Sequence, residues 1–264
     1  MMPVYLQSLG IAAPGLPGWE MARAVLSGGA TYQYEPLQLT APELLPATER
    51  RRSSDSVRLA LRVAAEALAC EQATALQPAA IFSSAYGDPV ITHKLCELLS
   101  GTPPMASPTL FHNSVHNAPA GYWSIATANR ATTSSLAAGE WSFAQGLVAA
   151  TAQCHSEQRP VLLLCYDLPY PSPFDAKCPT RAPFASALLL SQQRSESSLV
   201  QVNLQVVSGG EESLMQDEEL ESQRRTNPAA RALPLLGAIA RGGGECRIAF
   251  TRNSFLHLGI TSCN

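Results

Sequence analysis

Charged residues are scarce in this chain. Only 15% of its 264 residues are Asp, Glu, Lys or Arg, the net charge is −3, and the one basic run is Arg50-Arg51-Arg52. Proteins that bind nucleic acid neutralise phosphates with clustered basic side chains, and no such cluster is present. The composition argues against a nucleic-acid partner, whereas 46% hydrophobic residues are enough to form a substantial core.

The sequence also lacks the patterns of secreted, membrane-spanning and metal-stabilised proteins. Its N-terminus has no basic segment, and Gln7, Ser8 and Gly10 interrupt the apolar run, so we expect neither a signal peptide nor a membrane span. Seven cysteines form no C-x-x-C pair and lie mostly in apolar segments, as reduced, buried thiols do. We therefore predict a cytoplasmic protein with no disulfide framework, no metal site and no cofactor.

Apolar periodicity predicts a layered α/β fold. Strands are expected at 4–9, 79–84, 131–136, 161–166, 184–190 and 199–207, and helices at 19–27, 56–70, 88–99, 118–128 and 139–153. Asp55 is the predicted N-cap of the helix at 56–70. The continuously apolar run 161–166 is typical of a central strand covered on both faces.

The last quarter of the chain has a different composition. Residues 209–228 are polar and acidic, which favours a mobile loop over an acidic binding site. A short helix at 229–240 and a hairpin of 246–250 with 255–260 are predicted to follow.

The stretch SSLAAGEWSFAQG, residues 134–146, has the pattern of a turn that presents a catalytic nucleophile, because an extended run passes through small residues directly into a helix. Neither serine nor cysteine stands at the tip of this turn. Glu140 and Ser142 follow it, but GEWSFAQG is not G-x-S-x-G and no paired base can be named, which disfavours a serine hydrolase. We interpret Cys154 and Cys165, which lie in apolar segments, as packing residues.

Residues 107–146 resemble the β-ketoacyl synthases of the thiolase superfamily. Ser107-Pro108 is similar to the family's Ser-Pro turn, and Asn117 is similar to the Asn that precedes an Ala-Gly helix in the family. Residues 139–146 resemble its elbow helix, which has a glycine in the second turn. The resemblance covers about residues 3–208 and implies a thiolase-like layered fold, the N-terminal half of a ketosynthase. Residues 1–264 would then form a single domain, with 209–264 as a C-terminal extension that covers the sheet.

By this resemblance, the family's nucleophilic cysteine falls on Ala138, or on Gly139 after a slip of one residue. Neither can attack a thioester, and condensation needs a thiolate to carry the acyl chain. The family's two catalytic histidines belong to a second half that is essentially missing here, since only a loop, a helix and a hairpin follow residue 207.

The family includes subunits that have lost this cysteine. Chain-length factors resemble ketosynthases, pair with an active ketosynthase and cap the tunnel into which its product grows. A short type accompanies the ketosynthases of aryl polyene pathways, and the elbow SLAAGEWSF and the hairpin ending resemble that type. The resemblance implies a non-catalytic subunit of a ketosynthase heterodimer, with a sheet that extends across the interface and an acyl carrier protein bound through the complex. Two alternatives are a truncated condensing or decarboxylating enzyme and a pure assembly factor.

The segment DPVITHKLCELL, residues 88–99, resembles the helix that gates the tunnel in full-length chain-length factors. The family's gate residues would fall on Pro89, Thr92 and Cys96, which share one helical face at i, i+3 and i+7. The alternative is that this face is ordinary core.

The segment FHNSVHN supplies candidates for the partner interface. These are Phe111, His112, Asn113, His116 and Asn117. The spacing of the two histidines also fits a metal pair, but no third ligand cluster is near in sequence, so a structural or interface role is favoured. His93, His155 and His257 are isolated and are predicted to be structural.

Overall fold

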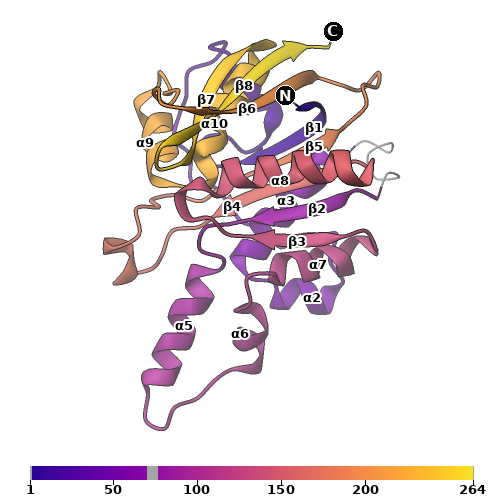
Figure 1. Ribbon diagram of the computed structural model, residues 1–264. Helices are drawn as coiled ribbons and strands as arrows, with labels where there is room; N and C mark the ends of the chain where they lie inside the picture. Colours follow the sequence, from indigo (N-terminus) through magenta and orange to yellow (C-terminus); the bar gives the residue numbers. More distant parts are fainter. Residues whose placement is uncertain (1, 70–76, 264) are drawn as a thin grey trace.

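A mixed sheet forms the centre of the molecule (Figure 1). The computed structural model describes residues 2–69 and 77–263. Its strands are β1 Met2–Ala12, β2 Ala79–Ser83, β3 Thr133–Leu136, β4 Val161–Asp167, β5 Phe184–Ser191, β6 Val200–Ser208, β7 Gly243–Thr251 and β8 Ser254–Ser262. The eight strands have the order β3-β2-β4-β5-β1-β6-β8-β7. β2 runs parallel to β3 and β4, and the other neighbouring strands run antiparallel.

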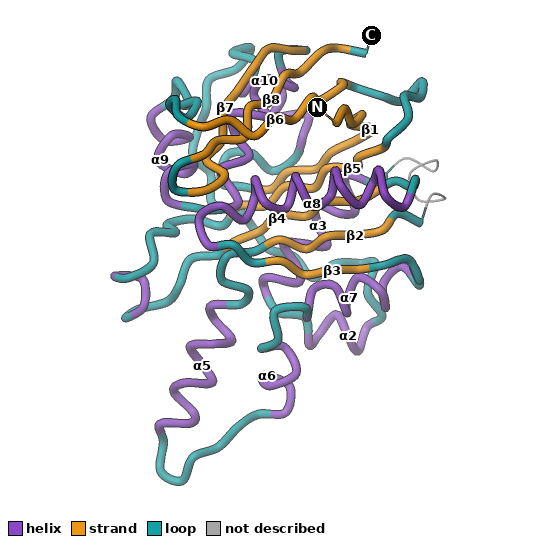
Figure 2. Tube along the Cα trace, in the orientation of Figure 1, coloured by secondary structure: helices purple, strands orange, loops and turns teal. Residues whose placement is uncertain are grey.

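Helices cover both faces of this sheet (Figure 2). α3 Asp55–Ala67 and α7 Ala118–Thr127 pack on one face, and α1 Trp19–Leu26, α8 Ser142–Glu157 and α10 Leu233–Ala240 pack on the other. The remaining helices are α2 Ala47–Arg52, α5 Pro89–Ser100, α6 Pro108–Asn113 and α9 Glu218–Thr226, with single 3₁₀ turns η1 Gly139–Trp141, η2 Phe174–Ala176 and η3 Ala229–Ala232. This arrangement confirms the predicted layered α/β fold.

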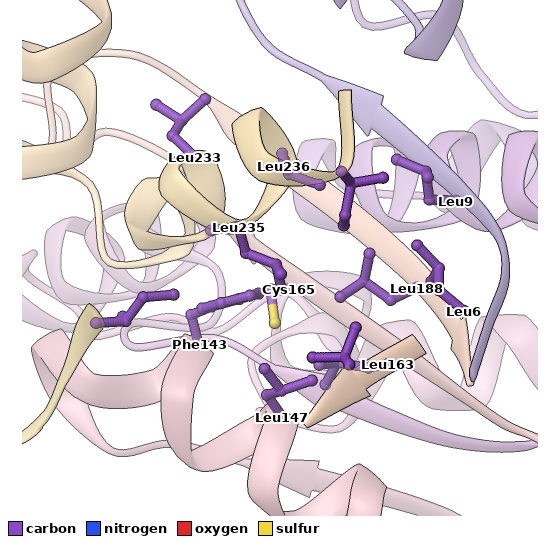
Figure 3. Packing of buried hydrophobic residues seen from close by; sticks show 14 of the residues in the cluster. Leu6, Leu9, Phe143, Leu147, Leu163, Cys165, Leu188, Leu233, Leu235 and Leu236 are labelled. Carbon is purple, nitrogen blue, oxygen red and sulfur yellow. The ribbon is translucent and has the colours of Figure 1, made fainter. Parts of the chain in front are cut away.

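β4 separates the two halves of the core. All seven of its residues are buried. Leu163 and Cys165 face the cluster that contains Phe143 and Leu147 of α8 and Leu235 of α10, as Figure 3 shows, whereas alternate residues of β4 face α3 and α7. The strand is covered on both faces, as its continuous apolar sequence predicts.

The start of α3 differs from the prediction. Ser54, not Asp55, is the N-cap: the Val57 N–H donates to Ser54 Oγ at 3.5 Å. Asp55 is the first helical residue and pairs instead with Arg58 at 3.3 Å. Both residue types cap helices well, so the sequence alone does not choose between neighbours. The predicted last residue of this helix, 70, lies outside the described residues.

Two short helices were not predicted from the sequence. α2 and α6 each span six residues, too few for an apolar period to repeat. The Arg50 guanidinium donates to the carbonyls of Glu43 and Leu45 at 3.0 Å and so holds the Pro-rich connection against α2.

The prediction of a mobile loop at 209–228 was wrong for residues 218–226, which form a helix. This segment contains α9, which Asp217 caps by accepting hydrogen bonds from the N–H groups of Glu219 and Leu220 at 3.0 Å. Glu212 lies between Arg224 and Arg231, with N–O distances of 3.0 and 2.7 Å. Burial acts to raise the pKa of its carboxyl, but the two arginines together outweigh it and hold the pKa below the usual range. Composition counts such charges but does not reveal that they pair.

The C-terminal extension joins the main sheet. β8 pairs with β6 along nine residues, and β7 forms the outer edge. The Ser213 N–H donates to the Arg247 carbonyl at 2.9 Å, and the Arg247 N–H donates to Ser213 Oγ at 3.0 Å. This short pairing covers part of the β7 edge, which would otherwise expose unpaired backbone groups.

The six described cysteines are free. Cys154, Cys165 and Cys246 are buried, as predicted, but Cys96 is exposed on α5. Within the described residues, 2–69 and 77–263, no helix is both long enough and apolar enough to cross a bilayer.

Candidate functional site

The elbow predicted from the sequence is present as a turn between β3 and α8. Ala138 has φ −141° and ψ 31°, and it precedes η1, which leads directly into α8. Gly139 has φ +57°, a conformation that disfavours any side chain. Of the two positions at which the resemblance places the family's cysteine, Ala138 is therefore the one whose backbone suits a side chain.

Hydrogen bonds within the turn occupy its polar groups. The Ala138 N–H donates to Ser142 Oγ at 3.1 Å, and the Ser142 hydroxyl donates to the Gly139 carbonyl at 2.7 Å. A catalytic elbow needs a free backbone N–H for the negative oxygen of the transition state. Here the Ala138 N–H is already bonded inside the turn and is not free for such an oxygen.

Gly146 explains how α8 packs beneath the elbow. A Cβ at this position would lie 3.1 Å from Leu163 Cδ1 and 3.1 Å from Ser83 Cβ. The glycine therefore permits close contact between α8 and the strands β2 and β4, which sets the position of the turn.

No histidine of the described residues contacts the turn. All five histidines lie within the described residues, and none has a hydrogen bond or ring contact with residues 138–142. Glu140 faces Arg231 of η3 at 3.6 Å. Burial raises the pKa of the Cys154 thiol to about 11 and that of Cys165 still further, so both are protonated, inert packing residues.

We expect that Ala138→Cys does not form an acyl-enzyme. A nucleophilic thiol needs a neighbouring base or cation to lower its pKa. None of the described histidines contacts the turn, and the nearby Arg231 guanidinium is paired with Glu140 and Glu212. Mass spectrometry of the variant after incubation with an acyl carrier-protein thioester tests this, with the wild-type chain as the control for its native cysteines. Acyl transfer to Cys at position 138 would contradict the interpretation of the elbow as scaffold.

α5 carries the three candidate gate residues and projects away from the sheet (Figure 1). Asp88 caps it by accepting a hydrogen bond from the Ile91 N–H at 2.9 Å. Pro89 is buried at the first helical position, whereas Thr92 and Cys96 are exposed. Thr92 and Cys96 therefore lie outside the core of this chain, and their role as a gate stays a prediction.

The five candidate interface residues separate into two groups. Phe111, His112 and Asn117 are exposed. Asn113 is buried and donates to the Arg52 carbonyl at 2.8 Å, and His116 Nε2 lies 2.9 Å from the Ser84 carbonyl oxygen. Asn113 and His116 thus fix α6 and the start of α7 to the body of the protein.

The two histidines of FHNSVHN do not converge. The His112 ring packs edge-on against Tyr122, with centroids 6.3 Å apart, while His116 is bonded to Ser84. In residues 2–69 and 77–263, no group of three or more His, Cys, Asp or Glu side chains is placed to hold a metal ion.

Residues 89–113 form an arm that consists of α5, the following connection and α6. Large apolar side chains are exposed on this arm. The exposed fractions are 55% for Leu99, 61% for Met105 and 68% for Phe111, and Val115, just beyond the arm, is 51% exposed. The arm projects on the side of the sheet where β3 is the edge strand (Figure 1). Exposed large apolar side chains and an open strand edge are both typical of a surface that a protein partner covers.

Asp167 is a buried acid that sequence reasoning missed. It ends β4 and is fully buried, and its Oδ1 accepts hydrogen bonds from Ser84 Oγ (2.9 Å), the Ala85 N–H (2.9 Å) and the Tyr86 N–H (3.3 Å). Burial raises its pKa to about 7, although these hydrogen bonds act in the opposite direction. The only available signal was an acidic residue at the end of a wholly apolar run.

Residues 27–256 match the family model described as "Beta-ketoacyl synthase, N-terminal domain". Among curated proteins, none matches this chain. A chain of the complex of the ketosynthase ApeO with its chain length factor ApeC from Xenorhabdus doucetiae is 25% identical, with a TM-score of 0.75 and coverage of 98% of this chain and 100% of that one. The ishigamide ketosynthase/chain length factor (12% identity, TM-score 0.73, 100% of both chains) shares the fold. So does the complex AntDE:AntF, an acyl-carrier protein with its ketosynthase (10% identity, TM-score 0.69, 99% of both chains). The chain therefore belongs to the family of β-ketoacyl synthase N-terminal domains.

Proposed function

We propose that this chain is the non-catalytic chain-length-factor subunit of a heterodimeric ketosynthase of the aryl polyene type. One observation carries the proposal: the elbow keeps its turn and its helix, but Ala138 has no reactive side chain and its N–H is bonded to Ser142. Such a turn connects β3 to α8 but provides no side chain that could form a covalent acyl intermediate.

The similarity in length supports this assignment. The match to a chain of the ApeO–ApeC complex spans nearly all of both chains. That complex joins a ketosynthase to a chain length factor, and its matched chain has no extra half beyond the region shared with this protein.

The exposed arm supports a macromolecular partner. Phe111 and Met105 are exposed on the arm that projects on the β3 side of the sheet (Figure 1), and a ketosynthase that extends the sheet from β3 would cover this arm. The exposed face of α5, with Thr92 and Cys96, then lines the tunnel of the partner, and an acyl carrier protein delivers its thioester to the partner's cysteine.

Co-expression with a full-length ketosynthase tests the partnership. We expect a stable heteromer that elongates acyl carrier-protein thioesters, and no condensation by this chain alone, because its elbow carries no nucleophile. Size-exclusion chromatography with mass spectrometry of carrier-bound products provides both measurements. Robust elongation by the purified single chain would contradict the proposal and favour a truncated condensing enzyme.

A further inference from the structure

The connection between β4 and β5 packs against α5 through a row of aromatic rings. Tyr86 contacts Tyr170 edge-on with centroids 5.6 Å apart, Tyr170 contacts Phe174 at 6.1 Å, and Phe174 contacts His93 of α5 at 5.8 Å. Each pair is in the edge-to-face arrangement that is favourable between aromatic rings. The row runs from the turn before α5 to the second turn of the helix.

His93 is the residue of α5 that Phe174 contacts. Only 16% of its side chain is exposed, and its Nε2 lies 3.2 Å from Glu97 Oε1, one turn further along α5. Thr92 is adjacent to His93 in sequence, and its hydroxyl donates to the Asp88 carbonyl at 2.8 Å. The ring of Phe174 therefore supports the flank of α5 next to the exposed gate positions.

Both ends of this connection are fixed to the body of the protein. At its start, Asp167 holds the turn at 84–86, from which the chain leads into α5. Near its end, Thr180 is buried and the Ala182 carbonyl accepts a hydrogen bond from Asn227 Nδ2 at 2.9 Å. Phe174 thus contacts α5 from a connection that is held at both ends by contacts outside that helix.

We propose that Tyr170 and Phe174 are positioning residues that orient α5, and with it Thr92 and Cys96, and so sharpen the product length at which the complex stops. This inference rests on the proposed function. Neither ring is assigned a contact with substrate. Removing one leaves the gate side chains in place but lets the helix move, so termination becomes less precise.

Phe174→Ala in the assembled complex tests the inference. We expect carrier-bound products outside the main length to increase about threefold, the effect of losing one edge-to-face contact. Hydrogen exchange of the backbone amides at 90–100 should also accelerate about threefold in the full chain. Phe174→Tyr keeps the ring and should restore both values, and Asp175→Ala, an exposed neighbour in η2, is the matched control.

The outcomes separate this inference from the proposed function. If Cys96→Phe changes product length but Phe174→Ala alters neither length nor exchange, the positioning role is wrong and the proposed function stands. If neither variant changes product length in a well-assembled complex, the proposed gate fails, and the positioning role fails with it. Should Phe174→Ala impair assembly, Phe174→Leu, which keeps apolar volume without the ring, provides the same test.

Discussion

Cys96→Phe is expected to shorten the products of the complex without abolishing the first condensations. Cys96 is exposed on α5, so a phenyl ring there extends outward from this chain toward the proposed tunnel. Adding a ring to a packed channel costs about 1–3 kcal/mol, enough to shift the favoured termination point by about tenfold or more. Mass analysis of carrier-bound products measures the shift.

Lys94→Phe is the matched control for this experiment. Lys94 is exposed on the same helix, but two residues from Thr92 and from Cys96, which places it on the opposite face. The same ring at this position should leave product length unchanged. An unchanged length distribution in a correctly assembled Cys96→Phe complex would show that length is set elsewhere and would favour an assembly factor.

Asp167→Ala is expected to destabilise the protein by about 3 kcal/mol or more. The change leaves the Ser84 hydroxyl and the Ala85 and Tyr86 N–H groups without their acceptor, and an unpaired buried donor costs about 1–3 kcal/mol. Asp167→Asn keeps an oxygen acceptor and nearly the same shape, so its loss should be much smaller. Urea unfolding of both variants and the wild type measures the free energies. Equal losses for Ala and Asn would show that the accepted hydrogen bonds are not what stabilises the turn.

The same residue predicts a pH dependence. Because burial raises its pKa from 3.8 to about 7, the folded protein binds a proton that the unfolded chain has released between these pH values. The stabilisation that this group contributes is therefore fully present below about pH 4 and is lost as the pH rises through about 7. The loss between pH 5 and pH 8 is about 3 kcal/mol.

Asp167→Asn should remove this decrease. Glu212 and Glu221 act in the opposite sense, because their lowered pKa values make stability fall only at acid pH, below the window of the experiment. Parallel stability curves for the wild type and Asp167→Asn from pH 5 to pH 8 would contradict the prediction.

Much of the fold and the central feature of the site follow from local sequence patterns. The apolar run 161–166 indicated the central strand, and residues 134–146 indicated an elbow without a nucleophile. Such patterns are readable because strand and helix periods repeat within about a dozen residues. The same limit explains the missed helices α2 and α6, whose six residues are shorter than the repeat needed to detect them.

Tertiary structure alone decided which polar groups meet. Asp167 and Ser84 are 83 residues apart in sequence, and they are brought together because β2 and β4 pair in parallel and end at the same edge of the sheet. In the same way, only the tertiary structure shows that Glu212 forms ion pairs with Arg224 and Arg231. It also shows that Asn113 is buried and hydrogen-bonded, whereas Phe111 is exposed. The sequence by itself determined most strands and the longer helices, and it showed that neither Ser nor Cys stands at the tip of the turn at 134–146, because these features are local. The partners of buried charges and the exposed face of α5 depend on strand order, which no local pattern encodes.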